Sequence, residues 1–182
     1  MPHSFVAPSA TLARTRLLAL DVDGVLSDGR LYFQADGMET KAFHTQDGHG
    51  LKLLKRVGIS VALITGRDSA MVTQRAKALG IAHLYQGCDN KLEALTALCA
   101  KLDIELEQVA YCGDDLPDLA AIEAAGVGIS VPNAPAYMQQ HADWVTPRAG
   151  GHGAVRDICD ALLAAQGHWD SIMARYRHAP AS

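Results

Sequence analysis

The sequence predicts a single α/β domain built on a Rossmann-like, mainly parallel sheet with helices on both faces. Short apolar segments of strand length alternate with segments of about ten residues that have helical patterns, which is the order that βαβ units produce. Hydrophobic residues make up 49% of the 182 residues and charged residues 20%, as is typical of a globular domain with a substantial core. We expect one domain over residues 1–182, with its core at about 16–165 and mobile tails at 1–12 and 167–182.

The first predicted strand, residues 17–22, is a run of aliphatic residues that ends in acidic ones. A β-hairpin is expected next, within residues 30–43, because Asp36-Gly37 is a strong turn signal between two alternating or aromatic segments. Further strands are expected at 59–65, 82–87, 108–113, 127–131 and 143–146. Helices are expected at 47–58, 68–80, 90–103, 116–126, 134–142 and 154–167, several of them closed by glycine.

The composition argues against several classes of protein. The formal net charge is −4 and no basic stripe is visible, which argues against nucleic-acid binding. No apolar run approaches the roughly 18–20 residues of a membrane span, and the N-terminal segment lacks the apolar core of a signal peptide. The four cysteines form no C-x-x-C pair, which favours reduced core residues over a disulfide framework. We therefore expect a cytoplasmic protein with no nucleic-acid or membrane partner.

Polar residues follow four of the predicted strands at the point where each strand ends. They are Asp21 and Asp23 after the first strand, Thr65, Gly66 and Arg67 after the second, Lys91 beyond the third, and Asp114 and Asp115 after the fourth. The carboxyl ends of parallel strands meet at one edge of a sheet, where ligands bind. Carboxylate-rich sites favour hard cations, and Mg²⁺ typically combines one or two carboxylates with waters and phosphate oxygens. We expect Mg²⁺ and a phosphate group here, with Lys91 and the NH groups around Gly66 offsetting the negative charge.

The spacing of Asp21 and Asp23 suits a phosphoryl-transfer reaction. In an extended segment, residues two apart point to the same side. One carboxylate can attack phosphorus and form an aspartyl-phosphate, while the other protonates the leaving oxygen and then deprotonates water. A solvated loop or a helix cap is the alternative for each aspartate taken alone. Lys91 taken alone is an ordinary surface lysine, and Arg67 and Arg75 fit a solvated face.

Four segments, in this order, resemble the motifs of the haloacid dehalogenase-like phosphatases. DVDGV at 21–25 matches their first motif, D-x-D-x-[TV], and ITGR at 64–67 looks like the second. Lys91 corresponds to the third and GDDLPD at 113–118 to the fourth. Within that superfamily, the short insert and the segments FHTQDGHGLKLL, GIAHLYQGCDNK and AGGHGAVRDICDALLAAQG closely resemble the phosphatases that act on 3-deoxy-D-manno-octulosonate 8-phosphate.

This resemblance implies a Mg²⁺-dependent hydrolase that releases phosphate and the free sugar acid on the route to lipopolysaccharide. It also implies a homotetramer without a large cap domain, in which the hairpin helps build the assembly and a neighbouring subunit helps close the site. Three alternatives stay open. They are a phosphatase for another sugar-acid phosphate, such as a nonulosonate 9-phosphate, a phosphotransferase of the same chemistry, and a non-catalytic regulatory or assembly subunit.

The resemblance also assigns roles to individual residues. Asp21 becomes the nucleophile and a metal ligand, and Asp23 becomes the general acid and base and a metal ligand through its carbonyl. Asp114 becomes the third protein ligand of the metal and Asp115 supports the site. Thr65 and Lys91 hold the phosphoryl group, next to the amide of Gly66. The predicted substrate contacts are Asp23, His44, Thr45, Gln46, Asp47, Gly48, Lys52, Arg67, Arg75 and Lys91. Gln46 departs from the pattern, because some members have arginine there.

Overall fold

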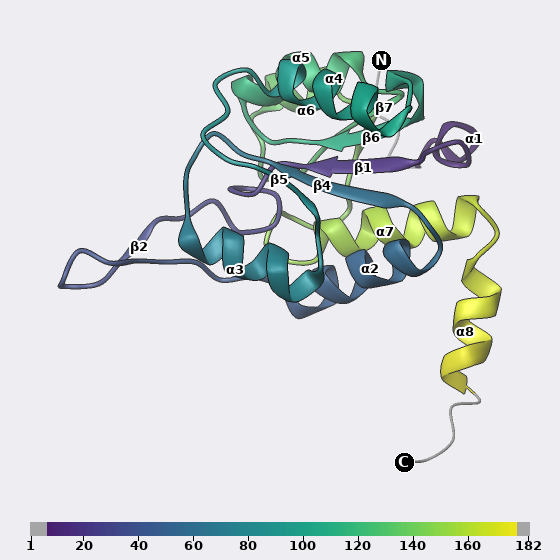
Figure 1. The fold of residues 1–182 in the computed structure, drawn as a ribbon, viewed down its shortest axis with the longest axis horizontal. Helices are drawn as coiled ribbons and strands as arrows, with labels where there is room; N and C mark the ends of the chain where they lie inside the picture. Colours follow the sequence, from purple (N-terminus) through teal and green to yellow (C-terminus); the bar gives the residue numbers. More distant parts are fainter. Residues whose placement is uncertain (1–6, 178–182) are drawn as a thin grey trace.

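The computed structural model describes residues 7–177 and shows one parallel sheet between two layers of helices (Figure 1). The six strands lie in the order β5-β4-β1-β6-β7-β8, and every neighbouring pair is parallel. This confirms the predicted fold class. The strands are β1 (Leu17–Leu20), β4 (Ser60–Ile64), β5 (His83–Tyr85), β6 (Val109–Cys112), β7 (Val127–Ser130) and β8 (Trp144–Val145).

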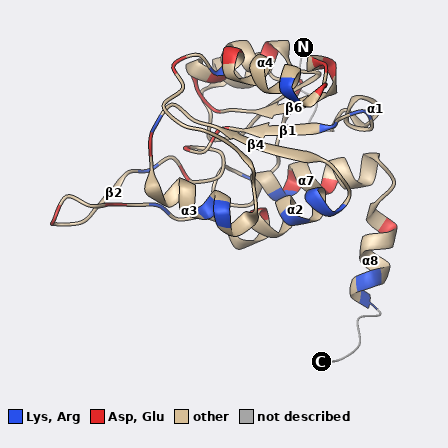
Figure 2. Ribbon diagram, in the orientation of Figure 1, with Lys and Arg blue, Asp and Glu red and all other residues tan. Residues whose placement is uncertain are grey.

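The helices cover both faces of this sheet (Figure 1). One layer contains α2 (Thr45–Arg56), α3 (Ala70–Leu79) and α7 (Ala154–Ala165). The other contains α4 (Lys91–Leu102), α5 (Leu119–Ala124) and α6 (Ala136–His141). Two 3₁₀ turns, Leu106–Gln108 and Leu116–Asp118, precede β6 and α5. Lys and Arg positions are prominent on α2 and α3, whereas Asp and Glu positions are prominent in the layer of α4 (Figure 2).

The order of the strands places a crevice at the carboxyl end of β1. Leu17 in β1 pairs with Ser60 in β4 on one side and with Val109 in β6 on the other. The chain leaves β1 toward β4 and β5 and later returns to β6, so the connections diverge on either side of β1. All four residues of β1 are fully buried, as expected for a central parallel strand covered on both faces. A topological switch of this kind is where α/β proteins bind ligands.

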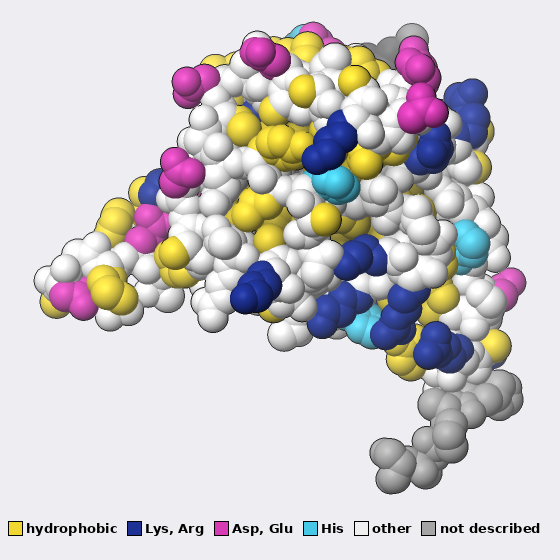
Figure 3. All heavy atoms as spheres, viewed as in Figure 1, with side chains coloured by type: hydrophobic (Ala, Val, Ile, Leu, Met, Phe, Trp, Pro, Cys, Tyr) yellow, Lys and Arg dark blue, Asp and Glu magenta, His cyan; other side chains and the backbone are white. Residues whose placement is uncertain are grey.

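The predicted hairpin is present and projects from the body of the molecule (Figure 1). It comprises β2 (Tyr32–Phe33) and β3 (Glu39–Thr40), which pair antiparallel. Gly37 has φ +84° at the turn, a conformation that side-chain-bearing residues rarely adopt. Exposed apolar side chains cover the hairpin, and Figure 3 shows them on its projecting end: Leu31, Tyr32, Phe33 and Met38.

The structure describes short helices near both ends of the chain, and the mobility of the tails stays a prediction. Helix α1 (Ser9–Leu12) buries Leu12 completely, and Gln166 donates hydrogen bonds to the carbonyls of Leu12 and Thr15. Helix α8 (Trp169–Arg177) packs Trp169 and Ile172 against the core. The sequence pattern predicts no helix there because these two apolar residues are spread among polar ones. Residues 1–6 and 178–182 lie outside the described part. None of the described helices combines the length and apolar character needed to cross a membrane.

Candidate active site

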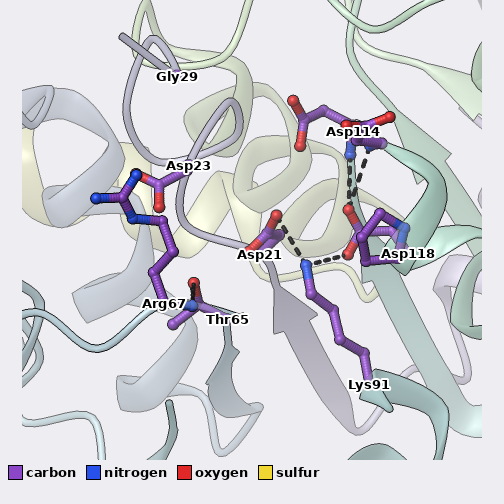
Figure 4. Close-up of a pocket in the computed structure, with 11 residues that line it drawn as sticks. Asp21, Asp23, Gly29, Thr65, Arg67, Lys91, Asp114 and Asp118 are labelled. Carbon is purple, nitrogen blue, oxygen red and sulfur yellow. Dashed lines mark hydrogen bonds and ion pairs between the residues drawn. The ribbon is translucent and has the colours of Figure 1, made fainter. Parts of the chain in front are cut away.

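A pocket of about 310 Å³ opens at the carboxyl ends of β1, β4 and β6 (Figure 4). All the residues predicted from the strand ends line it: Asp21, Asp23, Thr65, Gly66, Arg67, Lys91, Asp114 and Asp115. Gly29, Pro117 and Asp118 complete the lining. The predicted convergence at one edge of the sheet is therefore confirmed, because each of these residues follows a parallel strand or begins the next element.

Asp21 is a buried carboxylate directly beyond β1. Its Oδ1 accepts a hydrogen bond from the Val22 amide at 2.6 Å, and its Oδ2 lies 2.9 Å from Nζ of Lys91. Burial and the nearby charge of Asp118 raise the pKa of Asp21 to about 7, although Lys91 acts in the opposite direction. Burial also opposes the charge of Lys91, but Asp21 and Asp118 outweigh it and raise the lysine pKa. Lys91 is therefore a cation shared by two carboxylates.

Asp118 is a site residue to which the sequence pattern assigns no role, although it ends the GDDLPD segment. It is fully buried, and its Oδ1 accepts hydrogen bonds from Nζ of Lys91 and the hydroxyl of Tyr111, both at 2.7 Å. Its Oδ2 accepts from the amides of Asp114 and Asp115 at 3.2 and 3.3 Å. Asp118 thus fixes both the lysine and the loop after β6. The sequence could have indicated this role, because a lysine with its ammonium group buried in a site needs carboxylates around it.

The acidic cluster fits a hard divalent cation. One carboxylate oxygen each of Asp21, Asp114 and Asp118 lie within 4.8 Å of one another. Burial, followed by the charges of Asp118 and Asp115, raises the pKa of Asp114 to about 7. The oxygens of Asp118 accept four hydrogen bonds, whereas those of Asp21 have one each, from the Val22 amide and with Lys91. Asp21 and Asp114 therefore keep more oxygen lone pairs for a cation than Asp118 does. Crowded, partly desolvated carboxylates of this kind favour Mg²⁺.

The absence of a side chain at Gly24 leaves space for the carboxylate of Asp114. This residue has φ +86°, and a β-carbon at this position would overlap the carboxylate of Asp114. The chain reverses here immediately after Asp23. The glycine thus serves both the sharp turn and the close approach of the two loops.

Asp23 lies on the other side of Asp21 from Lys91 and Asp118 (Figure 4). Its Oδ1 accepts a hydrogen bond from Nζ of Lys41, which lies just after β3. Lys41 also lies 3.0 Å from Oε1 of Glu39. Burial lowers the pKa of Lys41, but its hydrogen bonds to Asp23 and Glu39 outweigh burial and raise it. The ammonium group therefore stays charged between the two carboxylates.

Thr65 and Gly66 lie where β4 ends. Thr65 is buried, and its hydroxyl accepts a long hydrogen bond of 3.4 Å from the amide of Arg67. Gly66 is exposed at the pocket. A hydroxyl and free backbone NH groups at such a turn are suitable donors to phosphate oxygens.

The predicted substrate contacts from residues 44–52 do not line this pocket, and neither does Arg75. His44, Thr45, Gln46, Asp47, Gly48 and Lys52 lie at the start of α2 or within it. Asp47 is fully buried and accepts a hydrogen bond of 2.8 Å from the amide of Arg156 at the start of α7. Gln46 accepts one from Arg148, and Arg75 donates one to the carbonyl of His44. Their roles in substrate binding stay predictions.

Comparison with known families supports the chemistry of this pocket. A family model described as haloacid dehalogenase-like hydrolase matches residues 82–158. The 3-deoxy-D-manno-octulosonate 8-phosphate phosphatases KdsC of Salmonella typhi and Escherichia coli K12 are each 51% identical over 155 residues, covering 85% of this chain and 82% of the relative. The enzyme of that name from Yersinia pestis is 47% identical over 154 residues, with the same coverage of 85% and 82%.

Solved structures agree with the sequence relatives. A 3-deoxy-D-manno-octulosonate 8-phosphate phosphatase from Moraxella catarrhalis, in complex with magnesium, phosphate and KDO, superposes with a TM-score of 0.90 and 51% identity. The match covers 92% of this chain and 97% of that one. A cobalt-bound deoxy-D-mannose-octulosonate 8-phosphate phosphatase from Haemophilus influenzae has a TM-score of 0.84 and 40% identity, covering 87% and 93% of the two chains.

Proposed function

This chain belongs to the 3-deoxy-D-manno-octulosonate 8-phosphate phosphatases of the haloacid dehalogenase-like hydrolases, and we propose that Asp21 is the nucleophile of its reaction. It is a Mg²⁺-dependent phosphomonoesterase that converts 3-deoxy-D-manno-octulosonate 8-phosphate to the free sugar acid and phosphate, a step in lipopolysaccharide biosynthesis. The observation that carries the proposed residue roles is the pocket itself, in which Asp21, Lys91 and Asp114 meet at the carboxyl ends of the strands.

The phosphoryl group is held by donors that line the pocket around Asp21. Lys91 supplies a charge, Thr65 a hydroxyl, and Gly66 a backbone NH group. Asp21 and Asp114 would hold Mg²⁺ with their side chains and Asp23 would add its backbone carbonyl, with Asp115 supporting this set. When bound, the cation would neutralise the carboxylates and the phosphoryl oxygens and keep Asp21 ionised.

The reaction takes place in two displacements at phosphorus. A carboxylate oxygen of Asp21 forms a bond to phosphorus while the bond to the sugar oxygen breaks, and the carboxyl of Asp23 gives its proton to that oxygen. The carboxylate of Asp23 then removes a proton from a water molecule. The water oxygen attacks phosphorus, the bond to Asp21 breaks, and inorganic phosphate leaves.

Asp21→Asn tests this assignment. We expect phosphate release from the 8-phosphate in the presence of Mg²⁺ to fall by roughly 10³-fold or more, because an amide cannot form the intermediate. Asp170→Asn, on the exposed surface of α8, serves as a control with unchanged turnover. Release by Asp21→Asn near the wild-type rate would refute the assignment. A higher kcat/KM for a nonulosonate 9-phosphate than for the 8-phosphate would place the chain with a different substrate.

We also propose that the chain assembles as a homotetramer and works in the cytoplasm. The pocket is open to solvent and the projecting hairpin carries exposed apolar side chains, so a neighbouring subunit packed on the hairpin would both bury them and help close the site. The four cysteines are free, which fits a reducing compartment.

A further inference from the structure

Lys41 is a cation with a nearly covered side chain, and it has no role in the reaction described above. It directly follows β3 of the hairpin, and only 1% of its side chain is exposed. Its ammonium group contacts Oδ1 of Asp23 and lies 3.0 Å from Oε1 of Glu39. Burying a lysine is costly unless it is paired. Its placement between two carboxylates therefore requires a specific arrangement of the hairpin against the pocket.

The carboxylate of Asp23 is in contact with this lysine. Within residues 7–177, Lys41 is the side chain that is hydrogen-bonded to the carboxylate of Asp23. The carboxylate is 22% exposed, and it lies immediately before the chain reversal at Gly24. A general acid has to lie within hydrogen-bond reach of the oxygen that it protonates. A partly exposed aspartate without a partner would populate several rotamers, and few of them would reach that oxygen.

Glu39 fixes the lysine in turn. Its Oε2 accepts a hydrogen bond of 2.6 Å from Arg67, which belongs to the loop after β4 and lines the pocket. Asp23, Lys41, Glu39 and Arg67 thus form one chain of alternating charges. This chain joins the loop after β1, the hairpin and the loop after β4. Both ends of it, Asp23 and Arg67, line the pocket, and Figure 4 shows them on the same side of Asp21.

We propose that Lys41 is a positioning residue that holds the carboxyl of Asp23 toward the leaving oxygen of the substrate. This inference rests on the proposed role of Asp23 as the general acid. Lys41 then contributes to the departure of the sugar oxygen and not to the attack of Asp21 on phosphorus. A purely structural lysine would affect both to the same extent.

Leaving groups of different basicity separate these two effects. A sugar alkoxide needs a proton to depart, whereas 4-nitrophenolate departs without one. Because kcat/KM reports the steps up to the first irreversible one, we expect Lys41→Met to lower kcat/KM for the 8-phosphate by about 10- to 100-fold. We expect the value for 4-nitrophenyl phosphate to stay within about threefold of wild type. Lys41→Arg, which keeps the charge, should restore part of the loss.

Equal losses on the two substrates would overturn the proposal, and so would no loss on either. In an Asp23→Asn background, Lys41→Met should cause no further loss, because both changes disable the same step. If Asp23→Asn lowers kcat/KM equally for both substrates, the general-acid role fails independently of Lys41. Lys41→Gln, which keeps a donor without the charge, makes the same comparison if Lys41→Met does not fold, as judged by circular dichroism.

Discussion

Asp118 shows how one carboxylate can organise a site without reacting. Its two oxygens accept hydrogen bonds from Lys91, Tyr111 and the amides of Asp114 and Asp115. Hydrogen bonds to a charged group in a buried setting are stronger than neutral ones. The same charge raises the pKa values of Asp21 and Asp114, after burial itself. Asp118 therefore fixes the donors of the site while it makes the neighbouring carboxylates more dependent on a cation.

Tyr111→Phe tests the contribution of this network to stability. The change removes the hydroxyl that donates to Asp118 at 2.7 Å and leaves the buried ring in place. We expect the free energy of unfolding to fall by about 1–3 kcal/mol, because a buried charged acceptor loses a donor. Urea denaturation followed by circular dichroism measures it. Tyr137→Phe is the matched control, since Tyr137 is exposed and its hydroxyl lies 3.4 Å from Asp115; comparable losses in the two variants would contradict the expected role.

The residues of this site divide into those that local sequence could place and those that it could not. Asp21, Thr65 and Asp114 follow strands, and a parallel sheet brings strand ends together whatever the loops do. Asp118 and Lys41 depend on packing between distant segments. Lys41 lies just after β3, at the end of the hairpin, and reaches Asp23 across 18 residues of chain. No periodicity in the sequence reports that contact.

At the level of elements, the hairpin and α2 illustrate the same division. The Asp36-Gly37 pair predicts the hairpin turn, and the structure confirms it with positive φ at Gly37. The start of α2 was expected to face the substrate. Its substrate contacts stay predictions. Asp47 is buried against the first turn of α7, a contact that local sequence cannot report because Arg156 lies 109 residues away.

The exposed face of the hairpin should be required for assembly. Phe33 and Met38 are 64% and 60% exposed, which is high for large apolar residues on an isolated element. We expect the double variant Phe33→Ser, Met38→Ser to lower the mass measured by light scattering from that of a tetramer toward that of smaller species. Tyr176→Ser, at an exposed position on α8, should leave the mass unchanged. A wild-type chain that scatters as a monomer at assay concentration would contradict the proposed assembly.

At the scale of the whole molecule, the fold was predictable because strand-length apolar segments alternate with helical segments along the sequence. Fully apolar strands such as β1 indicate a sheet buried on both faces, and the helices between strands indicate parallel connections. The chain ends were less predictable. Leu12 packs in the core from one end, and Trp169 and Ile172 pack against it from the other. So few apolar contacts in a segment produce no detectable period.

Proton binding and Mg²⁺ binding at the acidic cluster are linked, and both change the free energy of unfolding of the whole molecule. Asp21 and Asp114 each have a pKa of about 7, against an ordinary value of 3.8. Without Mg²⁺, these two carboxyls bind more protons in the folded protein than in the unfolded chain at any pH between 3.8 and about 7. The contribution of this pair to the free energy of unfolding therefore falls as pH rises from about 4 to about 7, and the loss is complete above it.

Mg²⁺ binds the deprotonated carboxylates, so its stabilising effect should grow over the same range. We expect the increase in Tm caused by saturating Mg²⁺ to be small near pH 5, to rise through pH 7 and to level off by about pH 8. Comparing Tm with Mg²⁺ and with a chelator at each pH cancels the groups that titrate independently of the cation. Asp114→Asn should abolish most of the increase at every pH. An increase of the same size near pH 5 and pH 8 would mean that the cation does not compete with protons at these two carboxylates.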